Sequence, residues 1–123
     1  MNLSSGKCVA RIVSALLYSI EGFRAAWNYE ASFRQEIILT SILTPLAFII
    51  GQSFTQSAVL LIVVYIVLIV ELVNSAVESV VDRIGDEYHE LSRRAKDMGS
   101  AAVFLSLVLC FAIWTLIIWQ NYF

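Results

Sequence analysis

Three long apolar runs dominate the pattern of hydrophobic and polar positions along the chain. They cover roughly residues 37–54, 57–81 and 100–119, and few polar residues interrupt them. Each run approaches the ~20 residues that a helix needs to cross ~30 Å of hydrocarbon. The pattern therefore predicts three transmembrane helices. Pro45 can kink the first of them, which leaves a carbonyl for a neighbouring helix to satisfy.

A different pattern precedes these runs. Apolar residues recur at helical spacing, and charged and polar residues occupy the other faces; the apolar positions are Val9, Ile12, Val13, Leu16, Ile20, Phe23 and Trp27. This pattern predicts an amphipathic helix over residues 6–34 that lies in the membrane interface. A helix that packs on protein gives the same pattern, and both arrangements can hold at once.

The composition supports a membrane protein. The chain has 123 residues, of which 59% are hydrophobic and 15% are charged, and a soluble domain of this size could not bury so much apolar surface. We therefore expect an all-α integral membrane protein, with an amphipathic surface helix and three transmembrane helices. Residues 1–123 are expected to form one membrane-embedded domain, with residues 82–99 as a loop.

The basic residues predict the orientation. All eight fall on one side of the predicted membrane: Lys7, Arg11, Arg24 and Arg34 precede the first run, and Arg83, Arg93, Arg94 and Lys96 lie between the second and third. Loops rich in lysine and arginine stay in the cytoplasm. The N-terminus and the 82–99 loop are therefore expected inside, and the C-terminus outside.

A polar stripe marks the end of the second run. Glu71, Asn74, Glu78 and Asp82 are three or four residues apart and share one helix face. A carboxylate at the bilayer centre costs ~2.5–3.5 kcal/mol on insertion scales, so such groups usually face a partner or a cavity. At ~1.5 Å per residue, Glu71 lies roughly 15 Å below Asp82. The stripe thus leads from the cytoplasm to the level of the lipid headgroups.

Three interpretations of the stripe remain open. It can be a structural seam between helices, a proton or cation relay in a small transporter, or a site for chemistry on a lipid headgroup. The segment "DEYHELSRRAKD" favours the third, because an enzyme that uses a charged soluble cosubstrate needs such a loop. Lys96 and Asp97 open the third transmembrane helix, where a lysine can meet phosphate. No G-x-x-x-x-G-K-[ST] or H-R-D motif is present, so spacing alone does not establish kinase chemistry.

Two stretches carry a resemblance to a known family. "ELVNSAVESVVDRIGDEYHELSRRAKDMGSAAV" and "GFRAAWNYEASFRQE" resemble the prokaryotic diacylglycerol kinase family, and the similarity covers nearly the whole chain. The resemblance implies a bacterial inner-membrane enzyme that phosphorylates diacylglycerol with ATP and Mg²⁺ and yields phosphatidate. It also implies a homotrimer with active sites built between subunits, and no nucleic-acid partner.

The resemblance also implies roles for individual residues. Glu71 resembles the catalytic base and Asn74 its essential polar neighbour, while Glu30 and Glu78 resemble the metal-binding carboxylates. The nucleotide contacts it implies are Arg11, Tyr18, Glu30, Glu78, Glu87, Tyr88, His89, Lys96 and Asp97. The lipid contacts it implies are Arg11, Ser19, Arg24, Ala31, Gln35, Glu71 and Ser100.

Some positions of the surface helix depart from the family pattern. Ser14 stands where a lysine is usual, Leu16 and Leu17 replace small residues, and Glu21 replaces a basic one. These departures bear on the lipid pocket and leave the stripe intact. A sister branch of the family phosphorylates undecaprenol, but its loop after the second span reads differently. The sequence therefore favours diacylglycerol over undecaprenol.

The predicted orientation can be tested with a topology reporter. A reporter fused after Phe123 should be active only outside the cytoplasm, because three spans place the C-terminus opposite the basic loops. Alkaline phosphatase and a fluorescent protein, fused in parallel at this position, measure the two sides. Fluorescence with no phosphatase activity would indicate an even number of spans.

Overall fold

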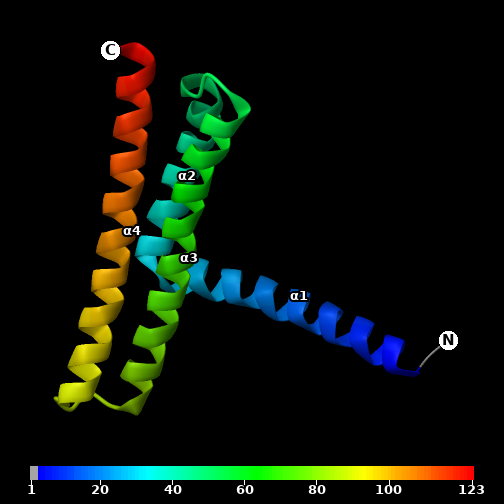
Figure 1. Ribbon diagram of the computed structural model, residues 1–123. Helices are drawn as coiled ribbons and strands as arrows, with labels where there is room; N and C mark the ends of the chain where they lie inside the picture. Colours follow the sequence, from blue (N-terminus) through cyan, green and yellow to red (C-terminus); the bar gives the residue numbers. More distant parts are fainter. Residues whose placement is uncertain (1–2) are drawn as a thin grey trace.

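Four helices make up the described part of the chain in the computed structural model, which covers residues 3–123 and contains no strand within them (Figure 1). They are α1 (Leu3–Tyr29), α2 (Ala31–Ile50), α3 (Phe54–Ile84) and α4 (Glu90–Tyr122). The predicted all-α fold is confirmed. Helices are the expected solution for a single chain in a bilayer, because they satisfy their backbone hydrogen bonds internally.

Helices α2, α3 and α4 run side by side as a bundle, and α3 packs against both of the others (Figure 1). Each is long and apolar enough to cross a membrane, which confirms the three predicted spans. The most apolar stretch of α4 is only 6% buried within the chain. Its outer surface is therefore available to lipid or to other chains.

A small cluster of apolar side chains holds the bundle together at the end where α4 finishes. It is built on Ala47 of α2, Leu60 of α3 and Trp114 of α4, and Leu60 is fully buried. The indole Nε1 of Trp114 donates a hydrogen bond to the Leu60 carbonyl at 3.2 Å. Close packing and such interhelical hydrogen bonds replace the hydrophobic effect as the force that joins helices in lipid.

Amide side chains tie the end of α4 to the α2–α3 turn. The Asn121 amide nitrogen donates to the Ile50 carbonyl at 3.0 Å and to Gln56 Oε1 at 2.9 Å. The Gln56 amide returns a hydrogen bond to Asn121 Oδ1 at 3.2 Å. This end of the bundle is therefore fixed by polar contacts, and the α3–α4 loop lies at the opposite end (Figure 1).

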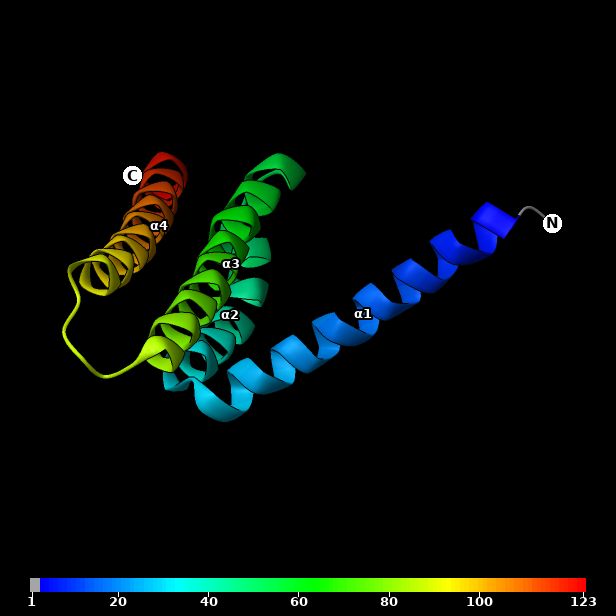
Figure 2. The same ribbon diagram turned by 90° about the horizontal axis from the view of Figure 1, so that it is seen from below.

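Helix α1 leaves the bundle at a steep angle and projects away from it (Figures 1 and 2). Its large apolar residues from Val9 to Trp27 are exposed along the helix. Only its last turns are anchored, through a cluster of Ala26, Phe33 and Leu68 from three different helices. The helix runs across the bundle axis, which is the arrangement that a helix lying on the membrane surface requires.

The helix boundaries differ from the expected ones. The surface helix was expected over residues 6–34, but α1 ends at Tyr29. The spans expected over 57–81 and 100–119 lie within the longer α3 and α4. The span expected over 37–54 overlaps α2, which begins earlier and ends at Ile50. Most of the expected 82–99 loop is helical, and only residues 85–89 connect α3 to α4. The boundaries differ because an apolar run indicates only the part of a helix that lies inside hydrocarbon. The ends of the helix are set by polar residues in water.

Those polar residues are visible at each boundary. The Ser53 hydroxyl accepts a hydrogen bond from Gln56 N at 3.1 Å and starts α3, and His89 Nδ1 accepts from Leu91 N at 3.1 Å and starts α4. Gly85 ends α3 with a φ of 151°, which side chains disfavour. Between α1 and α2, Glu30 adopts an extended conformation, with φ −117° and ψ 104°.

Candidate active site

An acidic pocket of about 160 Å³ lies where α1 meets α2, beside the middle of α3. Glu71, Asn74 and Glu78 of the predicted stripe line it, and Glu30 reaches it from the α1–α2 junction. Ser100 lines it from α4. Glu71 is only 8% exposed. The α1–α2 junction and α3, which are distant in the sequence, therefore bring carboxylates to one cavity that α4 also lines.

Asn74 connects the stripe internally. Its amide nitrogen donates to Glu78 Oε1 at 3.3 Å, one helical turn further along α3. Its amide oxygen is buried and has no hydrogen-bond partner within the described chain. This oxygen packs close to Gly99 of α4.

A second pocket of about 320 Å³ lies under the α3–α4 loop. Glu87, Tyr88, His89 and Lys96 line it together with neighbouring loop residues. Lys96 Nζ forms an ion pair of 2.8 Å with Asp82, the last member of the stripe. This pocket places mixed charges beside the loop, where a soluble ligand can enter.

An ion-pair network braces the start of α4. Arg93 contacts Glu90 at 2.6 Å and Asp97 at 3.0 Å, and the Tyr88 hydroxyl donates to Glu90 at 3.0 Å. These side chains are about half exposed or more, so the ion pairs add little to the free energy of unfolding and serve mainly to orient the side chains. Asp97, a predicted nucleotide contact, belongs to this network and does not line the pocket under the loop.

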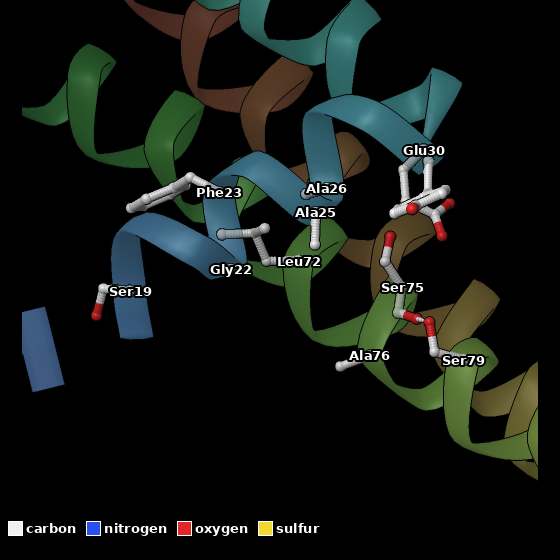
Figure 3. Close-up of a pocket in the computed structure, with 11 residues that line it drawn as sticks. Ser19, Gly22, Phe23, Ala25, Ala26, Glu30, Leu72, Ser75, Ala76 and Ser79 are labelled. Atoms are coloured by element: carbon white, nitrogen blue, oxygen red, sulfur yellow. Dashed lines mark hydrogen bonds between the residues drawn. The ribbon is translucent and has the colours of Figure 1, made fainter. Parts of the chain in front are cut away.

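The third cavity is an apolar groove of about 550 Å³ between α1 and α3, and Figure 3 shows the side chains that line it. Phe23 and Leu72 contribute much of its apolar surface, and Ser19 lies toward one side of the view. At the other side, Glu30 and Ser75 lie close together (Figure 3). Both of these residues also line the acidic pocket, so the groove and the pocket adjoin there.

Not every predicted site residue comes to these cavities in a single chain. Arg11 and Tyr18 lie on exposed faces of α1, well before its anchored end. Arg24 forms an exposed ion pair of 3.0 Å with Glu21. Ala31 and Gln35 are exposed in the first turns of α2 and line none of the three cavities. The single chain therefore assembles only part of the predicted site.

Comparison with known proteins adds an independent observation. The family model for prokaryotic diacylglycerol kinase matches residues 17–118. A diacylglycerol kinase of Escherichia coli (strain K12) is 46% identical over 112 residues, which cover 91% of this chain and 92% of the relative. Diacylglycerol kinases of Pseudomonas aeruginosa (46% identity, 88% of each chain) and Helicobacter pylori strain 26695 (39% identity, 91% of this chain and 84% of the relative) also match.

The chain belongs to the prokaryotic diacylglycerol kinase family. The resemblance noted in the sequence is confirmed, and the chain is a membrane kinase. Kinases of this family use ATP, so a nucleotide must reach the site. The transporter interpretation of the stripe loses its support, because the loop and the carboxylates now have an enzymatic context.

The acidic pocket suits a magnesium ion. Mg²⁺ prefers carboxylate oxygens and usually takes only one or two from the protein, because substrate phosphates and waters complete its shell. Among residues 3–123, no three acidic, histidine or cysteine side chains stand close enough to form a complete cage. Glu30 and Glu78, which both line the acidic pocket, match this incomplete kind of site.

Two residues near the pocket were not predicted from the sequence. Ser75 is buried and lines both the pocket and the groove; its position four residues after Glu71 was the available signal. Glu36 is partly buried in the first turns of α2. Its place at the start of the first apolar run marks it as a costly charge that the sequence analysis left unassigned.

Proposed function

We propose that this chain transfers the γ-phosphoryl group of ATP to the free hydroxyl of diacylglycerol and releases phosphatidate and ADP. The observation that carries the proposal is the contact between an apolar groove and an acidic pocket through Glu30 and Ser75. A lipid alcohol needs both parts, because its chains require apolar surface and its hydroxyl requires a base. The relatives that match most of this chain are named diacylglycerol kinases, which supports the same substrate.

In this proposal Glu71 is the general base. It accepts the hydroxyl proton as the lipid oxygen forms its bond to the γ-phosphorus, and the bond from phosphorus to the β–γ bridging oxygen breaks. Because Glu71 is 8% exposed, little water competes for this proton. Asn74 fixes the neighbouring carboxylate through its hydrogen bond to Glu78.

The lipid contacts extend from the groove into the pocket. Ser19 lies in the groove and Ser100 in the acidic pocket, so they border the two ends of the lipid path. Ala31, Gln35 and Arg24 lie near the α1–α2 junction and face outward, where a lipid headgroup would approach from the membrane.

The nucleotide half of the site lies under the α3–α4 loop. Lys96 and the residues Glu87, Tyr88 and His89 surround this pocket, and Asp97 lies one residue further along α4. Lys96 offers a positive charge for the phosphates. We propose that Arg11 and Tyr18 complete the nucleotide or lipid site from another copy in a homotrimer, since neither lines these pockets in its own chain.

Glu30 and Glu78 are the proposed metal ligands. A bound Mg²⁺ would neutralise the charge of the phosphates that Lys96 meets. Glu78 is tied to Asn74 and lies on α3, whereas Glu30 sits at the extended junction of two helices. The proposed enzyme sits in the inner membrane of a bacterium as one domain, with the nucleotide pocket on the cytoplasmic side.

The substrate is tested by offering two lipids to the purified protein. In micelles with radiolabelled ATP and Mg²⁺, label should enter phosphatidate from diacylglycerol and much less should enter undecaprenyl phosphate from undecaprenol. Thin-layer chromatography separates the two products. Preferential labelling of undecaprenol would indicate that the protein is an undecaprenol kinase of the sister branch. Label in neither lipid would contradict the proposed function.

The roles of the two stripe carboxylates can be separated. Glu71→Gln keeps size and hydrogen bonding but removes the base, so turnover should fall ~10²–10⁴-fold while nucleotide affinity changes little. Glu78→Gln makes the same chemical change about 10 Å nearer the loop, and should raise the Mg²⁺ and ATP concentrations needed for half-maximal rate. Steady-state kinetics and equilibrium nucleotide binding measure the difference.

Each of these variants serves as the control for the other, since both remove one charge from α3. Size-exclusion chromatography should show the same oligomer for both, because loss of a membrane charge lowers insertion cost. Near-normal turnover of Glu71→Gln would overturn the base assignment.

The groove can be filled without disturbing the fold. A Cβ at Gly22 would meet nothing within 4 Å, although Gly22 lines the groove. Gly22→Leu should therefore raise the KM for diacylglycerol by about tenfold, as expected for losing a lipid contact of ~1.4 kcal/mol, and leave the KM for ATP unchanged.

The matched control is Gly6→Leu, on the same helix. A Cβ at Gly6 also meets nothing within 4 Å, and Gly6 lines none of the cavities. Equal effects of the two substitutions on the KM for diacylglycerol would show that the groove is not the lipid-binding site.

A further inference from the structure

Helix α4 comes into close contact with the Asn74 side chain of α3 at Gly99. A Cβ placed on Gly99 would lie 2.0 Å from Asn74 Oδ1 and 3.1 Å from Asn74 Cγ. Real Cβ atoms do not come this close to other heavy atoms, so no other residue type fits here while Asn74 keeps its conformation. The bare backbone of α4 is thus the surface against which the Asn74 amide rests.

The same amide is held from its other side by Glu78. Its nitrogen donates to Glu78 Oε1 at 3.3 Å, and its oxygen, which faces Gly99, is buried without a partner. Within residues 3–123, the side-chain hydrogen-bond donor to the Glu78 carboxylate is Asn74. In the same range Glu78 forms no ion pair. The direction of the Glu78 carboxylate therefore depends on the Asn74 conformation.

We infer that Gly99 is a positioning residue: its missing side chain lets the Asn74 amide lie between α3 and α4, and this amide aims Glu78 into the acidic pocket. This inference rests on the proposed metal role of Glu78. Gly99 itself lines neither the acidic pocket, the groove nor the pocket under the α3–α4 loop. Its neighbour Ser100 lines the pocket, so α4 contributes to the site at the same level.

A side chain at position 99 would clash with the Asn74 amide, and the way this clash is relieved can be tested. The atom in the way is the far end of a flexible side chain, so rotation of Asn74 is the easiest relief. A rotated Asn74 no longer donates to Glu78. A methyl group at position 99 is therefore expected to spare the fold and to impair metal binding.

The experiment is a double-mutant cycle of Gly99→Ala and Asn74→Ala in the full-length protein. Equilibrium binding of Mn²⁺ with a non-hydrolysable ATP analogue is measured without lipid, alongside the Mg²⁺ dependence of turnover. Loss of such a supporting contact typically weakens metal affinity 10–100-fold, so Gly99→Ala should weaken Mn²⁺ binding about tenfold. With Asn74→Ala already present no clash remains, and Gly99→Ala should then change binding less than about twofold.

Gly6→Ala is the matched control. It makes the same substitution in a helix where the new Cβ meets nothing within 4 Å, so both changes gain similar helix propensity. Oligomer size and thermal stability should match the wild type in Gly6→Ala and Gly99→Ala.

Three results would overturn the inference. They are normal Mn²⁺ binding by Gly99→Ala, an equal loss in both Asn74 backgrounds, and loss of the folded oligomer in Gly99→Ala. None of them depends on the lipid substrate. A wild-type protein that phosphorylates no lipid would remove the proposed function, while the Mn²⁺ cycle would still decide the role of Gly99.

Discussion

The constraint on which the site depends is the cost of carboxylates below the surface of a membrane. Glu71 is nearly buried in a helix that is otherwise suited to hydrocarbon. The chain meets this cost by grouping its charges. Glu30 comes from the α1–α2 junction and Glu78 from the next turns of α3, so the carboxylates share one polar cavity instead of facing lipid separately. The proposed cation site and the proposed base both depend on the same concentration of negative charge that opposes insertion.

Close contact between α3 and α4 follows from this arrangement. Asn74 satisfies Glu78, but its own amide needs room between the helices, and Gly99 provides that room. At the far end, Asn121 and Gln56 join the same two helices through reciprocal amide hydrogen bonds. The register of α4 along α3 is thereby fixed at both ends, while the long apolar stretch between them stays largely exposed. The outer face of α4 is thus left to its surroundings.

Much of this could be predicted from the sequence, for physical reasons that also explain the failures. Hydrocarbon thickness and the need for internal hydrogen bonds make long apolar runs reliable guides to spans, and helical periodicity alone grouped Glu71, Asn74 and Glu78. The helix ends were misjudged because residues such as His89 act through caps that hydropathy does not report. Glu30 was assigned only through the family resemblance, and the contact of Gly99 with Asn74 depends on interhelical register. That register leaves no periodic signal in either helix.

Glu30 combines two properties with a thermodynamic consequence. It is the extended residue between α1 and α2, and its side chain lines both the groove and the acidic pocket. A ligand that fixes this carboxylate also restricts the angle between the two helices. Reciprocity then requires the converse: whatever holds α1 in place, such as the curvature or surface charge of the bilayer, changes the affinity of Glu30 for its ligand by the same factor. The composition of the membrane would in this way act as an effector of the enzyme that modifies it.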